Sequence, residues 1–189
     1  DRFGDRPYLI DGDRRIGFAE HRVLVERAAS ALRDRHGIRP GDRVALFAAN
    51  RWEWIVSFWA TSWLGAVPVL MNGFWTAEEF ADAVARVEPA LVIGDGPRLE
   101  RAKVVAGSFG VVRIEDDFEA LLGGAPATQA RSGHARPGEA PLADWASASG
   151  ASSSHAVQSH EDDPAFLIFT SGTTGRAKAV TVPHRALCG

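Results

Sequence analysis

The stretch RVALFAANRWEWIVSFWATSWLGAVPVLMNGFWTAEEFADAVARVEPALVIG, residues 43–94, decides the fold class. Short apolar runs bounded by turn residues predict strands at 43–48, 66–71 and 90–94, and helices at 52–64 and 76–87 lie between them. Thr76-Ala77-Glu78-Glu79 is typical of a capping box at the start of the second helix. This alternation predicts an α/β fold, a layered and mostly parallel sheet with helices on both faces.

The flanking segments extend the same pattern. Two apolar runs around Asp11-Gly12-Asp13 predict a hairpin over residues 8–17. A helix is expected over 18–36, with Gly37 as its left-handed C-terminal cap. On the other side we expect a helix over 97–106 and a strand over 111–114.

The chain divides by composition into three parts. Residues 1–122 carry the α/β pattern, and residues 161–189 form a strand, a loop and a second strand of the same domain. Between them, residues 123–160 are dominated by Ala, Ser, Gly and Pro. This composition predicts a flexible surface connection rather than a packed layer.

Composition excludes several function classes. The 189 residues are 46% hydrophobic and carry 21 basic against 24 acidic side chains, a net charge of −3, which argues against a nucleic-acid binder. A single cysteine, Cys188, favours a reducing compartment, and no secretory signal opens the chain, so we expect a cytoplasmic protein. Residues 54–77 carry no charge, but Gly65 and Pro68 favour a buried helix and strand over a transmembrane helix.

The segment with the clearest chemistry begins after Asp163-Pro164. The apolar run 165–169 predicts a buried strand, and the run 179–182 predicts a second one. The loop between them is rich in hydroxyl groups and contains two glycines, which free the backbone to bring amide N–H groups around an anion. Lys178, one of two lysines in the chain, adds a compact positive charge suited to phosphate oxygens.

Two other interpretations of this loop can be weighed. It is not a Walker loop, because two residues separate Gly172 from Gly175 and the lysine follows three positions later. A polar hairpin turn rich in small residues is the simpler alternative, but the density of hydroxyl groups ending in Lys178 favours an anion site. The group around His155 and His160 has no metal-ligand spacing, so no metal site is predicted.

Residues 170–178 resemble the phosphate-binding signature of the adenylate-forming superfamily, usually T-S-G-T-T-G-x-P-K-G. This superfamily comprises AMP-forming acyl-CoA synthetases, peptide-synthetase adenylation domains and firefly-type luciferases. The segments 39–46, 64–72 and 50–60 also look like parts of such enzymes, the last of them most like bacterial fatty-acyl-CoA ligases. Two residues depart from the signature: Ala177 replaces the usual Pro, and Ala179 replaces the usual Gly.

The resemblance implies an AMP-forming acyl-CoA ligase that activates a carboxylic acid, in particular a fatty acid, with Mg-ATP. The acyl-adenylate would then pass its acyl group to coenzyme A. It implies ATP, Mg²⁺ and coenzyme A as cofactors and co-substrates and a small carboxylic acid as partner. It implies no nucleic-acid partner, and it is compatible with peripheral contact with a membrane. The residues that carry over as nucleotide-binding by position are Thr170, Ser171, Gly172, Thr173, Thr174, Gly175 and Lys178.

The sequence contains no Y-G-x-T-E segment for Mg²⁺, no T-G-D segment for ribose and no C-terminal domain with an adenylating lysine. The resemblance therefore implies no catalytic residue and no metal ligand here. We expect an N-terminal fragment that is inactive alone. Two alternatives stay open: an adenylation domain for an amino or aryl acid, and a non-catalytic nucleotide-binding module.

Overall fold

The computed structural model describes residues 3, 6–104, 108–123, 160–170 and 177–187. Their elements follow in the order β1 (Pro7–Asp11), β2 (Arg14–Gly17), α1 (Phe18–His36), β3 (Arg43–Phe47), α2 (Trp52–Trp63), β4 (Val67–Leu70), α3 (Ala77–Val87), β5 (Leu91–Gly94), α4 (Gly96–Arg101), β6 (Gly110–Arg113), α5 (Ile114–Leu121), β7 (Pro164–Thr170), β8 (Lys178–Pro183) and the 3₁₀ turn η1 (His184–Ala186). The predicted hairpin, first helix, three central strands and their two helices are all confirmed within a few residues.

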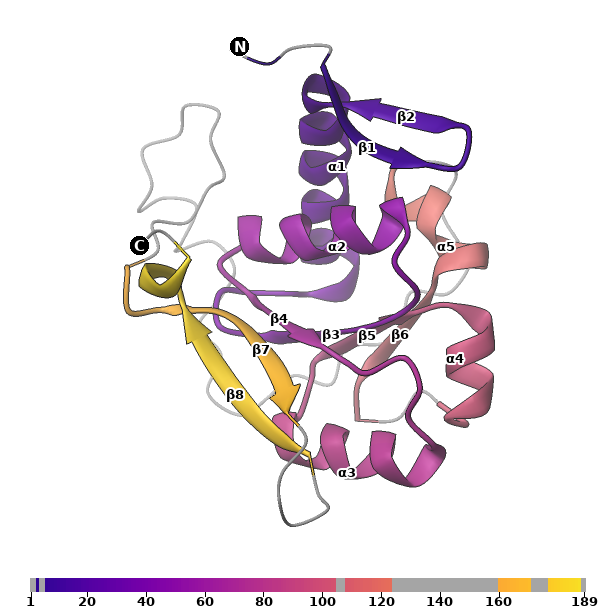
Figure 1. Ribbon diagram of the computed structural model, residues 1–189, viewed down its shortest axis with the longest axis vertical. Coiled ribbons are helices and arrows are strands. Elements are labelled where there is room, and N and C mark those ends of the chain that lie inside the picture. Colours follow the sequence, from indigo (N-terminus) through magenta and orange to yellow (C-terminus); the bar gives the residue numbers. More distant parts are fainter. Residues whose placement is uncertain (1–2, 4–5, 105–107, 124–159, 171–176, 188–189) are drawn as a thin grey trace.

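The described strands form one main sheet in the order β6-β5-β3-β4-β7-β8, and β1 and β2 form a separate hairpin. All neighbours in the main sheet are parallel except β7 and β8, which are antiparallel. Figure 1 shows α1, α2 and α5 on one face of this sheet and α3 and α4 on the other. The predicted α/β class, with helices on both faces of a mostly parallel sheet, is confirmed.

The central strands are buried on both faces. The core consists of two apolar clusters, one on each face of the sheet. In β3, Val44 and Leu46 belong to the cluster between the sheet and α1 and α2, whereas Ala45 and Phe47 belong to the cluster between the sheet and α3, called here the cluster over α3. All four are at most 1% exposed. Because successive strand residues face opposite sides, a strand covered by helices on both sides must be apolar throughout, as residues 44–47 are.

Local signals place several helix ends as expected. Thr76 Oγ1 accepts a hydrogen bond from the Glu79 N–H, and the Glu79 carboxylate accepts one from the Thr76 N–H, so the predicted capping box is present. Gly37 ends α1 with a φ of 66°, a left-handed conformation that glycine adopts without a Cβ penalty.

Two predictions after residue 94 need correction. The helix expected over 97–106 ends at Arg101, because Lys103 turns left-handed with a φ of 50°. The N–H groups of Lys103 and Val104 then bond the carbonyls of Glu100 and Leu99, a Schellman ending that stops the helix. Helix α5 was not predicted, although its buried Ile114, Phe118 and Leu121 have helical spacing.

The uncharged stretch 54–77 is divided between α2, β4 and the turn before α3. In the part of the chain that the structure describes, no helix combines the length and hydropathy needed to cross a bilayer. Residues 124–159, most of the predicted flexible connection, lie outside the described residues, so the three-part division stays a prediction.

Candidate functional site

The candidate site lies at the end of the β7–β8 hairpin where the two strands meet their connecting loop. The two strands pair from Pro164↔Pro183 to Thr170↔Lys178, so the last pair before the loop consists of the first and last residues of the predicted site. Cross-strand partners share one face of a hairpin. Thr170 and Lys178 are both exposed, and their hydroxyl and ammonium groups therefore lie on the same open face.

No carboxylate of the described residues pairs with Lys178. An exposed ammonium group can bind an anion from solution, and the Thr170 hydroxyl beside it can donate a hydrogen bond to the same anion. The loop residues Ser171, Gly172, Thr173, Thr174 and Gly175 lie outside the described residues, so their predicted amide cradle stays a prediction.

The two departures from the family signature fit the hairpin. Ala177 packs against the cluster over α3. Ala179 belongs to β8 and pairs with Phe169. Ala179 is not among the described residues with positive φ, so the backbone at this position does not need a glycine.

The prediction that residues 165–169 form a buried strand is confirmed for the strand but wrong in part for its burial. Ala165 is buried, but Ile168 is 39% exposed. Leu167 and Phe169 face the cluster over α3, whereas Phe166 has its ring 6.1 Å from Phe58 of α2. The open face of β7 is only partly covered because it lies near the edge of the described sheet, where few elements remain to cover it.

The end of β7 lies at the carboxyl edge of the sheet, on the same side as the residues that follow the other parallel strands. β7 runs parallel to β4, with Val69 opposite Leu167 and Leu70 opposite Ile168. In open α/β sheets ligands bind outside the carboxyl ends of the strands. The position of Thr170 and Lys178 agrees with that rule.

A buried carboxylate organises this edge. Asp95 directly follows β5 and is only 3% exposed. It accepts hydrogen bonds from the Ala49 N–H at 2.7 Å and from the Arg98 N–H at 3.0 Å, and it pairs with the Arg98 guanidinium at 2.7 Å. Asp95 therefore ties the loop after β3 to the start of α4, and its charge is compensated where it is buried.

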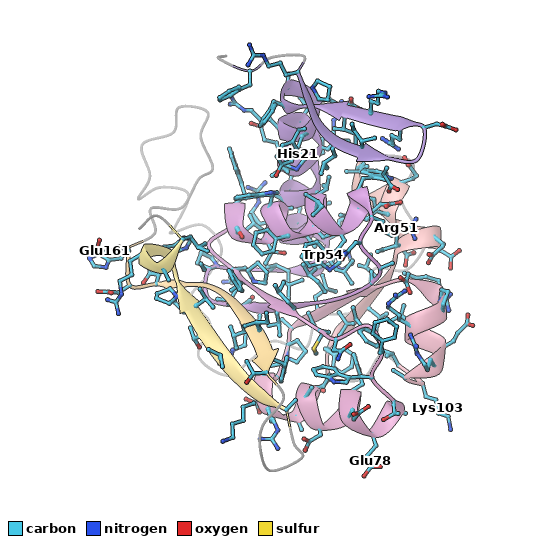
Figure 2. The ribbon with its side chains drawn as sticks, in the orientation of Figure 1. His21, Arg51, Trp54, Glu78, Lys103 and Glu161 are labelled. Carbon is cyan, nitrogen blue, oxygen red and sulfur yellow. The ribbon has the colours of Figure 1, made fainter. Side chains whose placement is uncertain are left out.

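Arg51 and Glu115 link the loop after β3 to the start of α5 at the same edge. The Arg51 guanidinium binds both carboxylate oxygens of Glu53 at 2.7 Å and reaches Glu115 at 2.8 Å. Figure 2 labels Arg51 at the start of α2, on the side of α5. Glu115 also accepts the Gly96 N–H at 2.8 Å. Desolvation alone would raise the pKa of Glu115, but this backbone bond and Arg51 outweigh it, so the pKa is lowered.

Sequence analysis did not single out Asp95 or Arg51. The sequence does contain a signal that would predict Asp95 as a helix N-cap. An Asp followed by Gly96 and Pro97 is typical of an N-cap residue with a proline in the first turn of the helix. No local signal points to Arg51, since Glu115 is distant in sequence. Two tryptophans of α2 have different surroundings: Trp52 is buried against Phe118, whereas Trp59 is 45% exposed and its indole N–H donates a hydrogen bond to the Tyr8 hydroxyl.

The donor set fits a nucleotide better than a metal. An ammonium and a hydroxyl on one face suit phosphate oxygens. Within the described residues no group of three or more His, Cys, Asp or Glu side chains could hold a metal ion. No ligand for Mg²⁺ is therefore assigned to these residues. His155 and Cys188 lie outside the described residues.

Comparison with known proteins identifies the family of the chain. The family described as "AMP-binding enzyme" matches residues 1–189. A 4-coumarate–CoA ligase 2 of Oryza sativa subsp. japonica is 34% identical over 97% of this chain and 32% of its own length. A medium/long-chain-fatty-acid–CoA ligase, FadD6 of Mycobacterium tuberculosis, is 29% identical over 97% of this chain and 27% of its own length.

Solved structures share the fold. The anthranilate–CoA ligase AuaEII, in complex with anthranoyl-AMP, superposes with a TM-score of 0.75 at 22% identity, over 97% of this chain and 32% of that one. The N-terminal subdomain of NpsA from Klebsiella oxytoca gives a TM-score of 0.68 at 24% identity, over 97% and 38%. The chain thus spans about a third of the length of these relatives. Its match to the family over its whole length shows that it belongs to the AMP-binding enzyme family.

Proposed function

We propose that the gene product containing these 189 residues is an AMP-forming acid–CoA ligase, with a fatty acid as its acid substrate. The observation that carries the proposal is the exposed Thr170–Lys178 pair at the carboxyl edge of the sheet. Relatives with the same family match are named as CoA ligases for 4-coumarate and for medium- and long-chain fatty acids. These names support the reaction class, and FadD6 supports the fatty-acid substrate.

In this reaction a carboxylate oxygen attacks the α-phosphorus of ATP. A new bond forms between that oxygen and phosphorus, the bond to the bridging oxygen breaks, and pyrophosphate leaves. The thiol of coenzyme A then attacks the acyl carbon, and AMP leaves. Mg²⁺ would supply further positive charge on the phosphates, and its ligands would lie outside the described residues.

Lys178 and Thr170 would act in the first step. The ammonium and hydroxyl groups would hold the β- and γ-phosphates of ATP while charge shifts toward pyrophosphate. Such fixed donors contribute by positioning and electrostatic stabilisation rather than by proton transfer. The loop 171–176 would add backbone and hydroxyl donors to the same phosphates.

The test is acid-dependent exchange of labelled pyrophosphate into ATP by the gene product, followed by CoA thioester formation. Octanoic, palmitic, 4-coumaric and anthranilic acids serve as probes. Lys178→Ala should lower kcat/KM for ATP about 100-fold, as removal of one fixed charge-stabilising donor does elsewhere. Lys103→Ala, which removes the other lysine on an exposed helix end, should stay within about twofold of wild type.

The outcomes separate the alternatives. Pyrophosphate exchange with thioester formation on the fatty acids supports the full proposal. A preference for an aromatic acid would leave the proposed reaction unchanged and would change only the proposed class of acid substrate. Exchange without any CoA thioester would indicate an adenylation domain that serves another acceptor. Absence of exchange with every acid, together with ATP binding that needs Lys178, would indicate a non-catalytic nucleotide-binding module.

A further inference from the structure

The end of β7 is held by an aromatic contact from the loop after β4. The ring of Trp75 meets the ring of Phe169 edge-on, with centroids 4.8 Å apart and planes at 82°. Trp75 is buried, at 6% exposure. Phe169 directly precedes Thr170, so this contact lies one residue from the candidate phosphate-binding pair.

This contact lies where sheet pairing no longer supports β7. Pairing between β4 and β7 reaches only to Leu70↔Ile168, and Phe169 and Thr170 continue beyond it with β8 alone beside them. An edge-to-face aromatic pair contributes about 0.5–1.5 kcal/mol beyond its buried area. Trp75 therefore anchors a strand end that the neighbouring parallel strand does not reach.

The anchor also sets the direction of the neighbouring side chain. Successive residues of a strand point to opposite faces. With Phe169 held in the cluster over α3, Thr170 must point to the open face, and Lys178 shares that face as its cross-strand partner. Loss of the Trp75 ring would let the strand end twist and would separate the hydroxyl from the ammonium group.

The loop that carries Trp75 is itself braced by α4. The Trp75 N–H bonds the Asn72 carbonyl at 3.2 Å, and the Arg101 guanidinium donates to the Gly73 carbonyl at 2.6 Å. Arg98 lies so close to Gly73 that a Cβ there would meet its Nε at 2.5 Å. Arg98 is in turn fixed by the buried Asp95. A series of contacts thus connects the end of β5, through α4 and the loop that carries Trp75, to Phe169.

We propose that Trp75 is a positioning residue for the nucleotide site: by holding Phe169, it keeps Thr170 and Lys178 on one face for the phosphates of ATP. The inference rests on the proposed function, and it adds a residue outside the glycine-rich loop. Its proposed effect is exerted through β7, by way of the contact with Phe169.

The test compares Trp75→Leu with Phe80→Leu in the gene product. Phe80 is an equally buried aromatic residue of the same cluster, but its ring partner is Phe47 at 4.7 Å. Both variants should lose stability. Only Trp75→Leu should raise the KM for ATP, by about tenfold, while the KM for the carboxylic acid changes less than twofold. Trp75→Phe keeps an edge-to-face ring and should stay within about threefold of wild type.

A second measurement does not depend on activity. Amide hydrogen exchange of the protein without ATP should become faster in residues 164–170 and 178–183 after Trp75→Leu, and should change there much less after Phe80→Leu. The double variant Trp75→Leu/Phe169→Leu should raise the KM for ATP no more than the stronger single variant, because the two residues share one contact.

Equal effects of Trp75→Leu and Phe80→Leu on the KM for ATP and on hairpin exchange would overturn the inference, since both changes would then act only through general stability. A wild-type protein that forms no adenylate would instead overturn the proposed function. In that case hydrogen exchange still decides whether Trp75 holds the end of the hairpin.

Discussion

The central strand β3 and the edge hairpin β7–β8 have similar apolar sequences but very different surroundings. Residues 44–47 of β3 are at most 1% exposed, whereas Ile168 and Val180, which face each other across the hairpin, are 39% and 41% exposed. The covered strand has helices over both faces, and the hairpin has packing mainly on the side of α3. Stability is therefore concentrated in the centre, and the candidate chemistry lies at an edge that can meet a ligand.

The largest effect should come from shortening a side chain of the central strand, with the same change in the hairpin as its comparison. Leu46→Ala removes a fully buried side chain and should lower the free energy of unfolding by about 3 kcal/mol. Ile168→Ala should cost about 1 kcal/mol or less because much of that side chain is already in water. Urea unfolding followed by tryptophan fluorescence measures both. Equal losses would contradict the contrast between centre and edge.

Asp95→Ala should have the next largest effect. It leaves the Arg98 guanidinium and the Ala49 N–H without their buried acceptor, which should cost about 2–3 kcal/mol. Asp95→Asn keeps an acceptor oxygen and should cost less. The same unfolding measurement applies, and a loss below that of Ile168→Ala would show that the carboxyl edge is not held by this residue.

Thr76→Ala tests the helix that covers the α3 face. Removing the capping hydroxyl frees the Glu79 N–H and should lower the free energy of unfolding by about 1 kcal/mol. Thr76→Ser retains the cap and should be close to wild type, as should Glu78→Gln, at an exposed position in the same turn. A loss in all three variants would point to helix propensity rather than to the cap.

The smallest effect concerns pH and Glu115. Since its pKa is lowered in the folded protein, the carboxylate adds stability above its unfolded pKa of 4.5, and this contribution is lost as pH falls through the lower folded value. The side chain is 40% exposed, so the contribution should stay below about 1 kcal/mol. The stability difference between wild type and Glu115→Gln should be constant near pH 7 and shrink below pH 4.5. A difference that grows toward low pH would contradict the sign.

Local patterns predicted the elements better than their surroundings. The capping box at Thr76 and the glycine cap at Gly37 are contacts within a few residues, so the sequence contains the whole signal. The exposed face of β7 could not be predicted in this way. The run 165–169 reads as buried because it is apolar, but burial depends on which elements lie above it.

The candidate site shows the same division. Lys178 and the hydroxyl-rich loop stand out in the sequence because their residue types suit phosphate. Arg51, Asp95 and Trp75 do not, because each acts through a partner on another element: Glu115, Ala49 and Phe169. Such pairs can be predicted only when the order of the strands in the sheet is known, and the pattern of apolar residues does not specify which strands become neighbours.

By itself, the sequence determined the α/β class, the place of most helices and strands, and the segment with phosphate-binding character. These follow from side-chain periodicity, capping residues and composition, which act over a few residues along the chain. Only the tertiary structure decided that β7 lies beside β4, that Thr170 and Lys178 share an open face, and that Trp75 packs against Phe169 at the end of β7. Those outcomes depend on contacts between residues far apart in sequence, which form only once the strands have assembled in this order.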